Sequence, residues 1–306
     1  MSSSSSAVPA SRLSRSAPLL LGFVVVILLL GNVLIQGTAK TWWSVVTLGV
    51  VEGVTEFLPI SSTAHLLLIS KLLNFQDNIG GTFEIFIQLG AILAVVVYYT
   101  RDLLAQAQAF PHSAPTRRFW FAILLAFLPA AIVGLLLRDW IKTVLFASPT
   151  VIAWALIIGG VVLVGIERMA LRVTTTRVEQ TSFRQALGIG FAQVLSLIPG
   201  TSRSATSIIG GMLGGLDRAA ATRFSFYLSI PTLGAATVVD LLGSLDQLTA
   251  GDLPRLAVGT VVAFVTALLS IGWLLRYIAR HTWTAFGVYR IVVGAAVLVL
   301  VAMGIL

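Results

Sequence analysis

Two long apolar stretches, at about 42–73 and 183–213, are each split near the middle by a proline and a cluster of hydroxyl residues. Each is long enough to enter a membrane, because about 20 apolar residues span the hydrocarbon layer. A broken backbone survives at membrane depth only where protein or a wet cavity covers it. We therefore predict two re-entrant helical hairpins, each of which enters and leaves the membrane on one side.

The remaining apolar runs predict the rest of the fold. Hydrophobic residues make up 57% of the 306 residues and charged residues 10%, which fits several membrane spans and no soluble domain. Long solid runs, instead of alternating ten-residue segments, exclude a β-barrel. The sequence therefore predicts a single all-α polytopic membrane domain over 41–306. Its unbroken runs lie at about 83–99, 119–137, 151–166, 224–243, 256–275 and 284–305.

Residues 1–40 form a separate N-terminal region. The first 18 are rich in serine and carry Arg12 and Arg15, so we expect them to be disordered. The apolar segment 19–35 fits either an uncleaved signal anchor or a signal peptide cleaved shortly before Lys40. We favour the anchor, which leaves its basic flank inside the cell.

The distribution of charge supports this topology. With the first hairpin returning outside and the second returning inside, thirteen of the twenty Lys and Arg residues fall on the inner side. Five fall outside, and two, Arg203 and Arg290, lie within the membrane. Cytoplasmic loops carry such a basic excess, so the formal net charge of +8 does not predict a nucleic-acid partner.

A weak internal repeat relates the two hairpins. The segment 58–62 aligns with 198–202 at one fixed offset, so that Pro59 corresponds to Pro199. A helix that begins with phenylalanine and contains Leu-Gly-Ala follows each segment. Because the hairpins enter from opposite sides in this topology, we predict an inverted repeat whose broken elements meet near the midplane.

The first hairpin carries two carboxylates. Glu52 and Glu56 lie one helical turn apart on the same face, where like charges repel unless a proton or cation lies between them. A charged group at the bilayer centre costs about 2.5–3.5 kcal/mol on insertion scales, so the pair indicates function. We predict that they hold a divalent cation, Mg²⁺ or Ca²⁺, together with diphosphate oxygens. The alternatives are that one of them is a general base, or that the pair is structural.

Hydroxyl groups and a histidine follow the first turn. Ser61, Ser62 and Thr63 are placed to cap the returning helix, and the N–H groups of a helix N-terminus also attract phosphate. We predict Ser62 as the nucleophile, because His65 lies one turn further on and can accept its proton. His65 is also a candidate to attack phosphorus itself. Glu84, near the start of the run at 83–99, is expected either to lie behind the site residues or to lie at the membrane interface, and not to be catalytic.

The second hairpin supplies a guanidinium. Arg203 lies at the centre of an apolar hairpin and needs an anionic partner, and its planar fork suits phosphate oxygens. No role follows from the sequence for Arg290. Together with the carboxylates, hydroxyls and imidazole, this arginine predicts phosphate chemistry inside a membrane. The hydroxyl groups expected either to bind phosphate or to cap and pack the helix are Ser202, Ser204, Thr206 and Ser207.

These motifs resemble those of a known family. The segment 52–65, EGVTEFLPISSTAH, resembles the first signature of the bacterial undecaprenyl-diphosphate phosphatases, also called bacitracin resistance proteins. The segment 199–204, PGTSRS, resembles the second, and the resemblance extends over about 42–306. The second signature often continues with glycine and then threonine where this chain has Ala205 and Ser207, and neither change removes a functional group.

The resemblance implies hydrolysis of undecaprenyl diphosphate to undecaprenyl phosphate and inorganic phosphate, which recycles the cell-wall lipid carrier and confers bacitracin resistance. It also implies six spans besides the two hairpins, a divalent-cation requirement, and a plasma-membrane site that opens toward the periplasmic or extracellular side. The residues that match the family's functional motifs are Glu52 and Glu56 as paired glutamates, Ser62 and His65 as nucleophile and base, and Arg203, beside Ser202, as phosphate ligand.

A flippase or transporter for an anionic polyprenyl phosphate lipid is the alternative function, because inverted repeats of broken helices are also a transporter architecture. It would need Arg203 and the paired glutamates but no nucleophile. The sequence leaves open whether the protein forms a homodimer.

Overall fold

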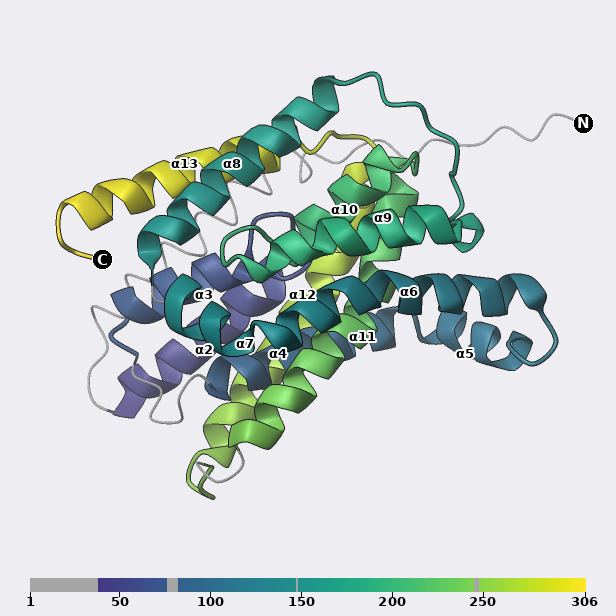
Figure 1. Cartoon of the computed structure of the whole chain (residues 1–306). Helices are drawn as coiled ribbons and strands as arrows, with labels where there is room; N and C mark the ends of the chain where they lie inside the picture. The colour runs from purple at the N-terminus through teal and green to yellow at the C-terminus, as the bar shows by residue number, and fades with distance from the viewer. Residues whose placement is uncertain (1–37, 76–81, 147, 245–247) are drawn as a thin grey trace, which may run out of the picture.

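The computed structural model describes residues 38–75, 82–146, 148–244 and 248–306 (Figure 1). Within these ranges the chain is mainly helical, and its β-structure is limited to an isolated bridge between Thr175 and Leu216. Most of the predicted region 1–40 lies outside the described residues. The helices are α2 (Thr38–Thr55), α3 (Ser62–Leu72), α4 (Thr82–Tyr98), α5 (Thr100–Ala109), α6 (Ala114–Leu136), α7 (Arg138–Trp140), η1 (Ile141–Leu145), α8 (Pro149–Arg168), η2 (Val178–Gln180), α9 (Phe183–Val194), η3 (Leu195–Leu197), α10 (Arg203–Leu213), α11 (Arg218–Ser244), α12 (Leu253–Ile278) and α13 (Thr284–Ala302).

Five of the described helices, α6, α8, α11, α12 and α13, are long and apolar enough to cross a membrane. A sixth candidate is α4 together with α5, which meet at a bend of 66°. The outer faces of the spans carry apolar side chains at helical spacing, which fits contact with lipid. The prediction of an all-α polytopic membrane protein with about six spans is confirmed. Exposed rows include Phe121, Leu124 and Leu128 on α6 and Val261, Val265 and Leu269 on α12.

Both interrupted stretches form helical hairpins. In the first, α2 packs against α3, and in the second, α9 packs against α10. The two returning helices, α3 and α10, have eleven residues each. Each begins after a serine whose side chain accepts a hydrogen bond from the helix, Ser61 for α3 and Ser202 for α10. Such N-capping satisfies one of the N–H groups that the start of a helix leaves free.

The structural repeat differs by one residue from the repeat predicted from the sequence. The sequence alignment paired Ser62 with Ser202. In the structure Ser61 and Ser202 are the equivalent caps, so Ser62 and Arg203 are the equivalent first residues of α3 and α10. The second turn has one more residue between its proline and its cap. Gly200 lies in that turn with a φ of 93°, a conformation that glycine adopts without steric cost.

Small residues let the helices around the hairpins approach closely. α12 packs against α2 and α4, and α13 lies along α8 (Figure 1). A Cβ atom on Gly53 would lie 2.3 Å from the carbonyl oxygen of Ala263, and one on Gly160 would lie 2.6 Å from that of Gly287. Such close approach is typical of membrane helices, which associate by packing because lipid is as apolar as their side chains.

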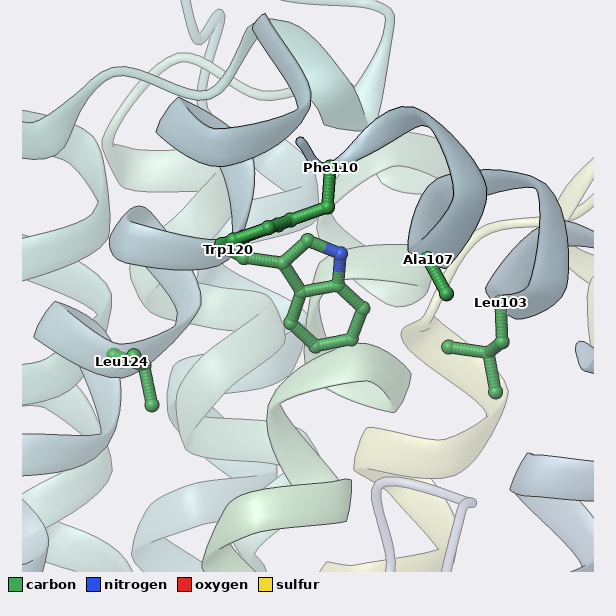
Figure 2. Close-up of a pocket in the computed structure, with 5 residues that line it drawn as sticks. All are labelled: Leu103, Ala107, Phe110, Trp120 and Leu124. Atoms are coloured by element: carbon green, nitrogen blue, oxygen red, sulfur yellow. The ribbon is translucent and has the colours of Figure 1, made fainter. Parts of the chain in front are cut away.

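The helix α5 was not predicted from the apolar runs. Its sequence is too polar to form such a run, and the chain bends into it directly after the apolar α4. An amphipathic helix of low hydrophobicity is typical of the membrane interface. An apolar pocket of about 440 Å³ lies between α5 and α6 (Figure 2). Its lining residues are Leu103, Ala107, Phe110, Trp120 and Leu124.

Candidate active site

The turns of the two hairpins meet inside the protein. The Ser204 Oγ donates to the Leu58 carbonyl oxygen at 2.8 Å, which joins the start of α10 to the first turn. The Arg203 Nη2 lies 2.9 Å from the Glu56 Oε1, and the two side chains are only 9% and 5% exposed. The two broken elements therefore bring a guanidinium and a carboxylate into direct contact, away from solvent and lipid.

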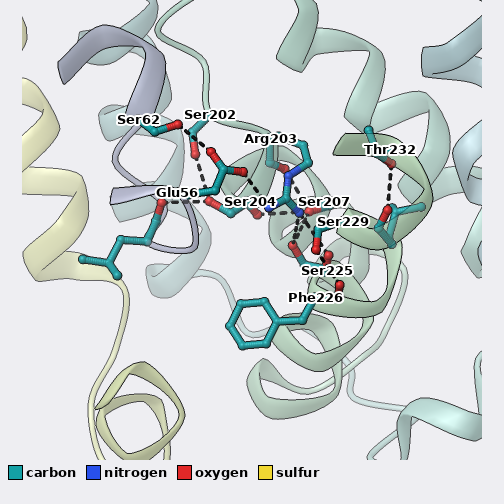
Figure 3. Close-up of polar contacts among 12 residues, drawn as sticks. Glu56, Ser62, Ser202, Arg203, Ser204, Ser207, Ser225, Phe226, Ser229 and Thr232 are labelled. Carbon is teal, nitrogen blue, oxygen red and sulfur yellow. Dashed lines mark hydrogen bonds and ion pairs between the residues drawn. The ribbon is translucent and has the colours of Figure 1, made fainter. Parts of the chain in front are cut away.

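Glu56 connects the predicted nucleophile to the predicted phosphate ligand (Figure 3). Its Oε2 accepts a hydrogen bond from the Ser62 Oγ at 2.6 Å, and its Oε1 accepts one from Arg203. A carboxylate bonded to a serine hydroxyl is placed to take the proton when that oxygen attacks. The Ser62–Glu56–Arg203 contact thus joins a nucleophile, a base and an anion-binding group.

Arg203 is held by the neighbouring helix α11. Its Nη1 donates to the Ser225 carbonyl oxygen at 3.0 Å and lies 3.4 Å from the Ser225 Oγ. The Phe57 ring centroid lies 6.0 Å from its Cζ, within the range of a cation–π interaction. Its buried Nε has no hydrogen-bond partner among the described residues. That N–H is therefore available to a phosphate oxygen.

His65 makes contacts that occupy both of its ring nitrogens. Its Nδ1 lies 2.7 Å from the Ser61 carbonyl oxygen, which only accepts, so Nδ1 carries the proton. Its Nε2 then accepts a hydrogen bond from the Tyr289 hydroxyl at 2.7 Å. The structure therefore places Glu56, and not His65, against the Ser62 hydroxyl. The role of His65 as a base or nucleophile stays a prediction.

The other predicted phosphate ligands lie around the N-termini of α3 and α10. The Ser61 Oγ accepts a hydrogen bond from the Ala64 backbone nitrogen at 3.4 Å. The Ser202 Oγ accepts one from the Ala205 backbone nitrogen at 3.2 Å. Thr63 is half-buried in the first turn of α3. Thr206 and Ser207 donate to backbone carbonyls of their own helix. These bonds account for capping and packing, and phosphate binding by these hydroxyls stays a prediction.

Glu52 has a buried oxygen that suits a cation. The residue is 1% exposed, and its Oε1 has no hydrogen-bond partner within the described part of the chain. An unpaired buried carboxylate oxygen is costly unless a ligand satisfies it. The described residues contain no group of three His, Asp or Glu side chains able to hold a metal alone. Mg²⁺ commonly binds one or two carboxylates and completes its shell with phosphates, so Glu52 and Glu56 fit such a cation.

Glu84 lies half-buried in the first turn of α4. A carboxylate at this end of a helix is stabilised by the helix dipole. The charge of the Glu84 carboxylate also repels that of Glu52, which agrees with its predicted place near the site.

Three residues of the site were not predicted. Ser225, which holds Arg203, had one local signal: it lies between Phe224 and Phe226. Tyr289, which binds His65, and Arg290, which binds both hairpin turns, lie far from the hairpins in the sequence. No local pattern indicates such contacts, because they arise only when α13 packs against α8.

Comparison with known proteins identifies the family. The family model described as "Bacitracin resistance protein BacA" matches residues 45–296. The chain belongs to the BacA family. An undecaprenyl-diphosphatase of Deinococcus radiodurans is 48% identical over 268 residues, which are 87% of this chain and 97% of that protein.

Two further relatives of this BacA family member carry the same enzyme name. Undecaprenyl-diphosphatase 1 of Mesorhizobium japonicum is 50% identical, over 82% of this chain and 94% of that protein. The undecaprenyl-diphosphatase of Laribacter hongkongensis is 49% identical, over 82% of this chain and 92% of that protein. The family match includes the turns of both hairpins and all the site residues from Glu52 to Arg290. The resemblance noted in the sequence is therefore confirmed.

Proposed function

We propose that this BacA family member hydrolyses undecaprenyl diphosphate to undecaprenyl phosphate and inorganic phosphate. In the cell this reaction recycles the lipid carrier of cell-wall synthesis and confers bacitracin resistance. The names of the relatives support the substrate, and the membrane-spanning helices support a lipid substrate. The observation that carries the proposal is the Ser62–Glu56–Arg203 contact, because it combines the groups that phosphoryl transfer requires.

Substrate binding begins at Arg203. Its Nε is free of protein partners among the described residues, and its Nη2 is held by Glu56. The terminal phosphate of the diphosphate binds Nε and replaces Glu56 at Nη2, since a guanidinium binds phosphate oxygens in pairs. Glu56 then loses its ion pair with Arg203 and keeps the hydrogen bond through which it accepts the Ser62 proton.

Ser62 is the nucleophile of this mechanism. As its Oγ attacks the terminal phosphorus in line, its proton passes to Glu56, and the bond from phosphorus to the bridging oxygen breaks. Undecaprenyl phosphate leaves with the electron pair of that bond. Water then attacks the phosphorus of the phosphoserine, the bond from phosphorus to the Ser62 Oγ breaks, and Glu56 returns its proton to that oxygen as inorganic phosphate is released. Arg203 stabilises the negative charge on the transferring phosphoryl group in both steps.

A divalent cation bound to Glu52 and Glu56 would neutralise charge on the diphosphate oxygens. Glu52 is the firmer ligand, because Glu56 is shared with Ser62 and Arg203 whereas the Glu52 Oε1 is unpaired within the described residues. We place the enzyme in the plasma membrane with the site opening to the periplasmic or extracellular side. The basic excess on the opposite side of the predicted topology supports this orientation.

The deciding experiment measures phosphate release from undecaprenyl diphosphate by the purified protein in detergent. Multiple turnovers are expected, with loss of activity in a chelator and recovery when Mg²⁺ or Ca²⁺ is added back. A flippase needs a sealed membrane to act, so phosphate release in detergent separates hydrolysis from that alternative. If no phosphate is released with either cation, the proposed hydrolysis is wrong.

A further inference from the structure

Arg290 lies in α13 with 0% of its surface exposed, and its five guanidinium contacts are all to backbone carbonyl oxygens. A guanidinium has five N–H donors, so each donor is used. The contacts are Nε to Leu156 at 3.3 Å, Nη1 to Pro59 at 3.1 Å and to Thr201 at 2.9 Å, and Nη2 to Ala155 at 3.1 Å and to Gly200 at 3.0 Å.

The carbonyl groups that Arg290 binds belong to three separate elements. Pro59 lies in the turn of the first hairpin, and Gly200 and Thr201 lie in the turn of the second. The other two carbonyls belong to α8. Buried backbone carbonyls need hydrogen-bond partners, and a turn between two helices cannot supply all of them itself. One side chain therefore binds both hairpin turns and ties them to α8.

The chain leaves space for this guanidinium at Gly159 in α8. A Cβ atom on Gly159 would lie 2.1 Å from the Arg290 Nη2 and 2.7 Å from its Cζ. The guanidinium could not move aside without breaking bonds to the turns. A Cβ atom on Gly165, in the same helix, would have no neighbouring atom within 4 Å. The two glycines thus form a matched pair for an experiment.

We propose that Arg290 is a positioning residue that fixes the two hairpin turns relative to each other. Pro59 precedes Ser62 by three residues, and Thr201 precedes Arg203 by two, so the contacts of Arg290 set where the nucleophile and the phosphate ligand meet. A misplacement of about 1 Å in an active site can lower the rate by about 100-fold. The inference rests on the proposed hydrolysis for its kinetic test and on geometry alone for its structural test.

The kinetic test compares Gly159→Ala and Arg290→Lys with Gly165→Ala. Lysine keeps the charge but has three donors on one nitrogen, so it cannot serve five carbonyls on three elements. We expect kcat to fall about 10- to 100-fold in the first two variants, with KM for undecaprenyl diphosphate changed less than about 3-fold. Gly165→Ala should match the wild type. Wild-type kcat in Gly159→Ala would overturn the proposal, and this variant keeps Arg290 itself, so the test does not depend on the folding of Arg290→Lys.

The structural test uses spin labels on the two returning helices. The chain has no cysteine, so cysteines introduced at Leu72 in α3 and Leu213 in α10 would be the sole labelling sites. Both side chains are exposed, at 45% and 56%. We expect the distance distribution between the labels to broaden or shift in Gly159→Ala and to stay as in the wild type in Gly165→Ala. An unchanged distance distribution in Gly159→Ala would contradict the proposed role of Arg290. A wild type that releases no phosphate would contradict only the proposed hydrolysis, and the distance measurement would still test Arg290.

Discussion

Ser61 and Ser202 are equivalent caps in the two hairpins, and both have a positive φ, 72° and 76°. Residues other than glycine rarely adopt such a φ, and strain of this kind costs about 1–3 kcal/mol. The residue after each cap, Ser62 in one hairpin and Arg203 in the other, binds the same carboxylate, that of Glu56. The strained caps therefore lie where the two halves of the site are joined.

Replacement of Ser61 tests this strain. Ser61→Ala removes the cap and keeps the unfavourable φ, whereas Ser61→Gly removes the cap and relieves the strain. Loss of a serine cap to alanine costs about 1 kcal/mol, and loss to glycine costs only a few tenths. We expect Ser61→Ala to lower the melting temperature in detergent more than Ser61→Gly does. Equal melting temperatures would show that the positive φ carries no strain.

Replacement of Glu56 and His65 tests which group is the base. We expect Glu56→Gln to lower kcat by about 10²- to 10⁴-fold, because general-base catalysis contributes about that much. His65→Gln should have the smaller effect, since both nitrogens of His65 are bound to Ser61 and Tyr289. The measurement is kcat for phosphate release. Trapping of a labelled phosphoenzyme on His65 instead of Ser62 would contradict this mechanism.

Removal of Arg203 affects both turnover and stability. Arg203→Met is expected to abolish most phosphate release and to leave the buried Glu56 carboxylate without its cationic partner. Breaking a buried ion pair in this way costs about 3–5 kcal/mol, whereas replacing both partners with apolar residues is often nearly neutral. The double variant Arg203→Met with Glu56→Met should therefore recover thermal stability without activity. A double variant no more stable than Arg203→Met alone would show that the ion pair is not what stabilises this contact.

Gly53, within the first motif, lets α2 pack closely against α12 and takes no part in the chemistry. A Cβ atom on Gly53 would meet the Ala263 carbonyl oxygen at 2.3 Å and the Thr266 Oγ1 at 2.1 Å, whereas one on Gly234 has no atom within 4 Å. Overpacking of this kind costs about 1–3 kcal/mol. We expect Gly53→Ala to lower the melting temperature and to lower kcat by displacing Glu52. Gly234→Ala is the control, and equal effects of the two variants would count against close packing of α2 on α12.

The sequence was sufficient to predict the membrane fold and the two hairpins. Their signals are local: apolar runs for the spans, and proline with hydroxyl residues for the breaks. The meeting of the two hairpins was predicted from their repeat, but the ion pair between Arg203 and Glu56 was not. Arg203 was expected to bind phosphate and the glutamates a cation, and both residues are costly in a membrane without a partner. The helix α5 was missed because a polar interfacial helix leaves no apolar run.

Other features could not be predicted because they depend on contacts distant in sequence or on irregular backbone. The repeat was misaligned by one residue, since the extra residue lies in a turn where no periodicity fixes the register. The spacing of Ser62 and His65 allowed a hydrogen bond, but the Ser61 carbonyl competes for the imidazole. Arg290 binds only backbone carbonyls, which every residue has, so no sequence pattern marks its partners.

Ser62 and Arg203 are equivalent in position but bring different chemistry to the site. Two copies of the first hairpin would bring four carboxylates together without a guanidinium, and two copies of the second would bring two guanidiniums without a carboxylate. A duplicated gene with identical halves could not assemble this site. The site therefore depends on the difference between the two hairpins, and neither hairpin can substitute for the other.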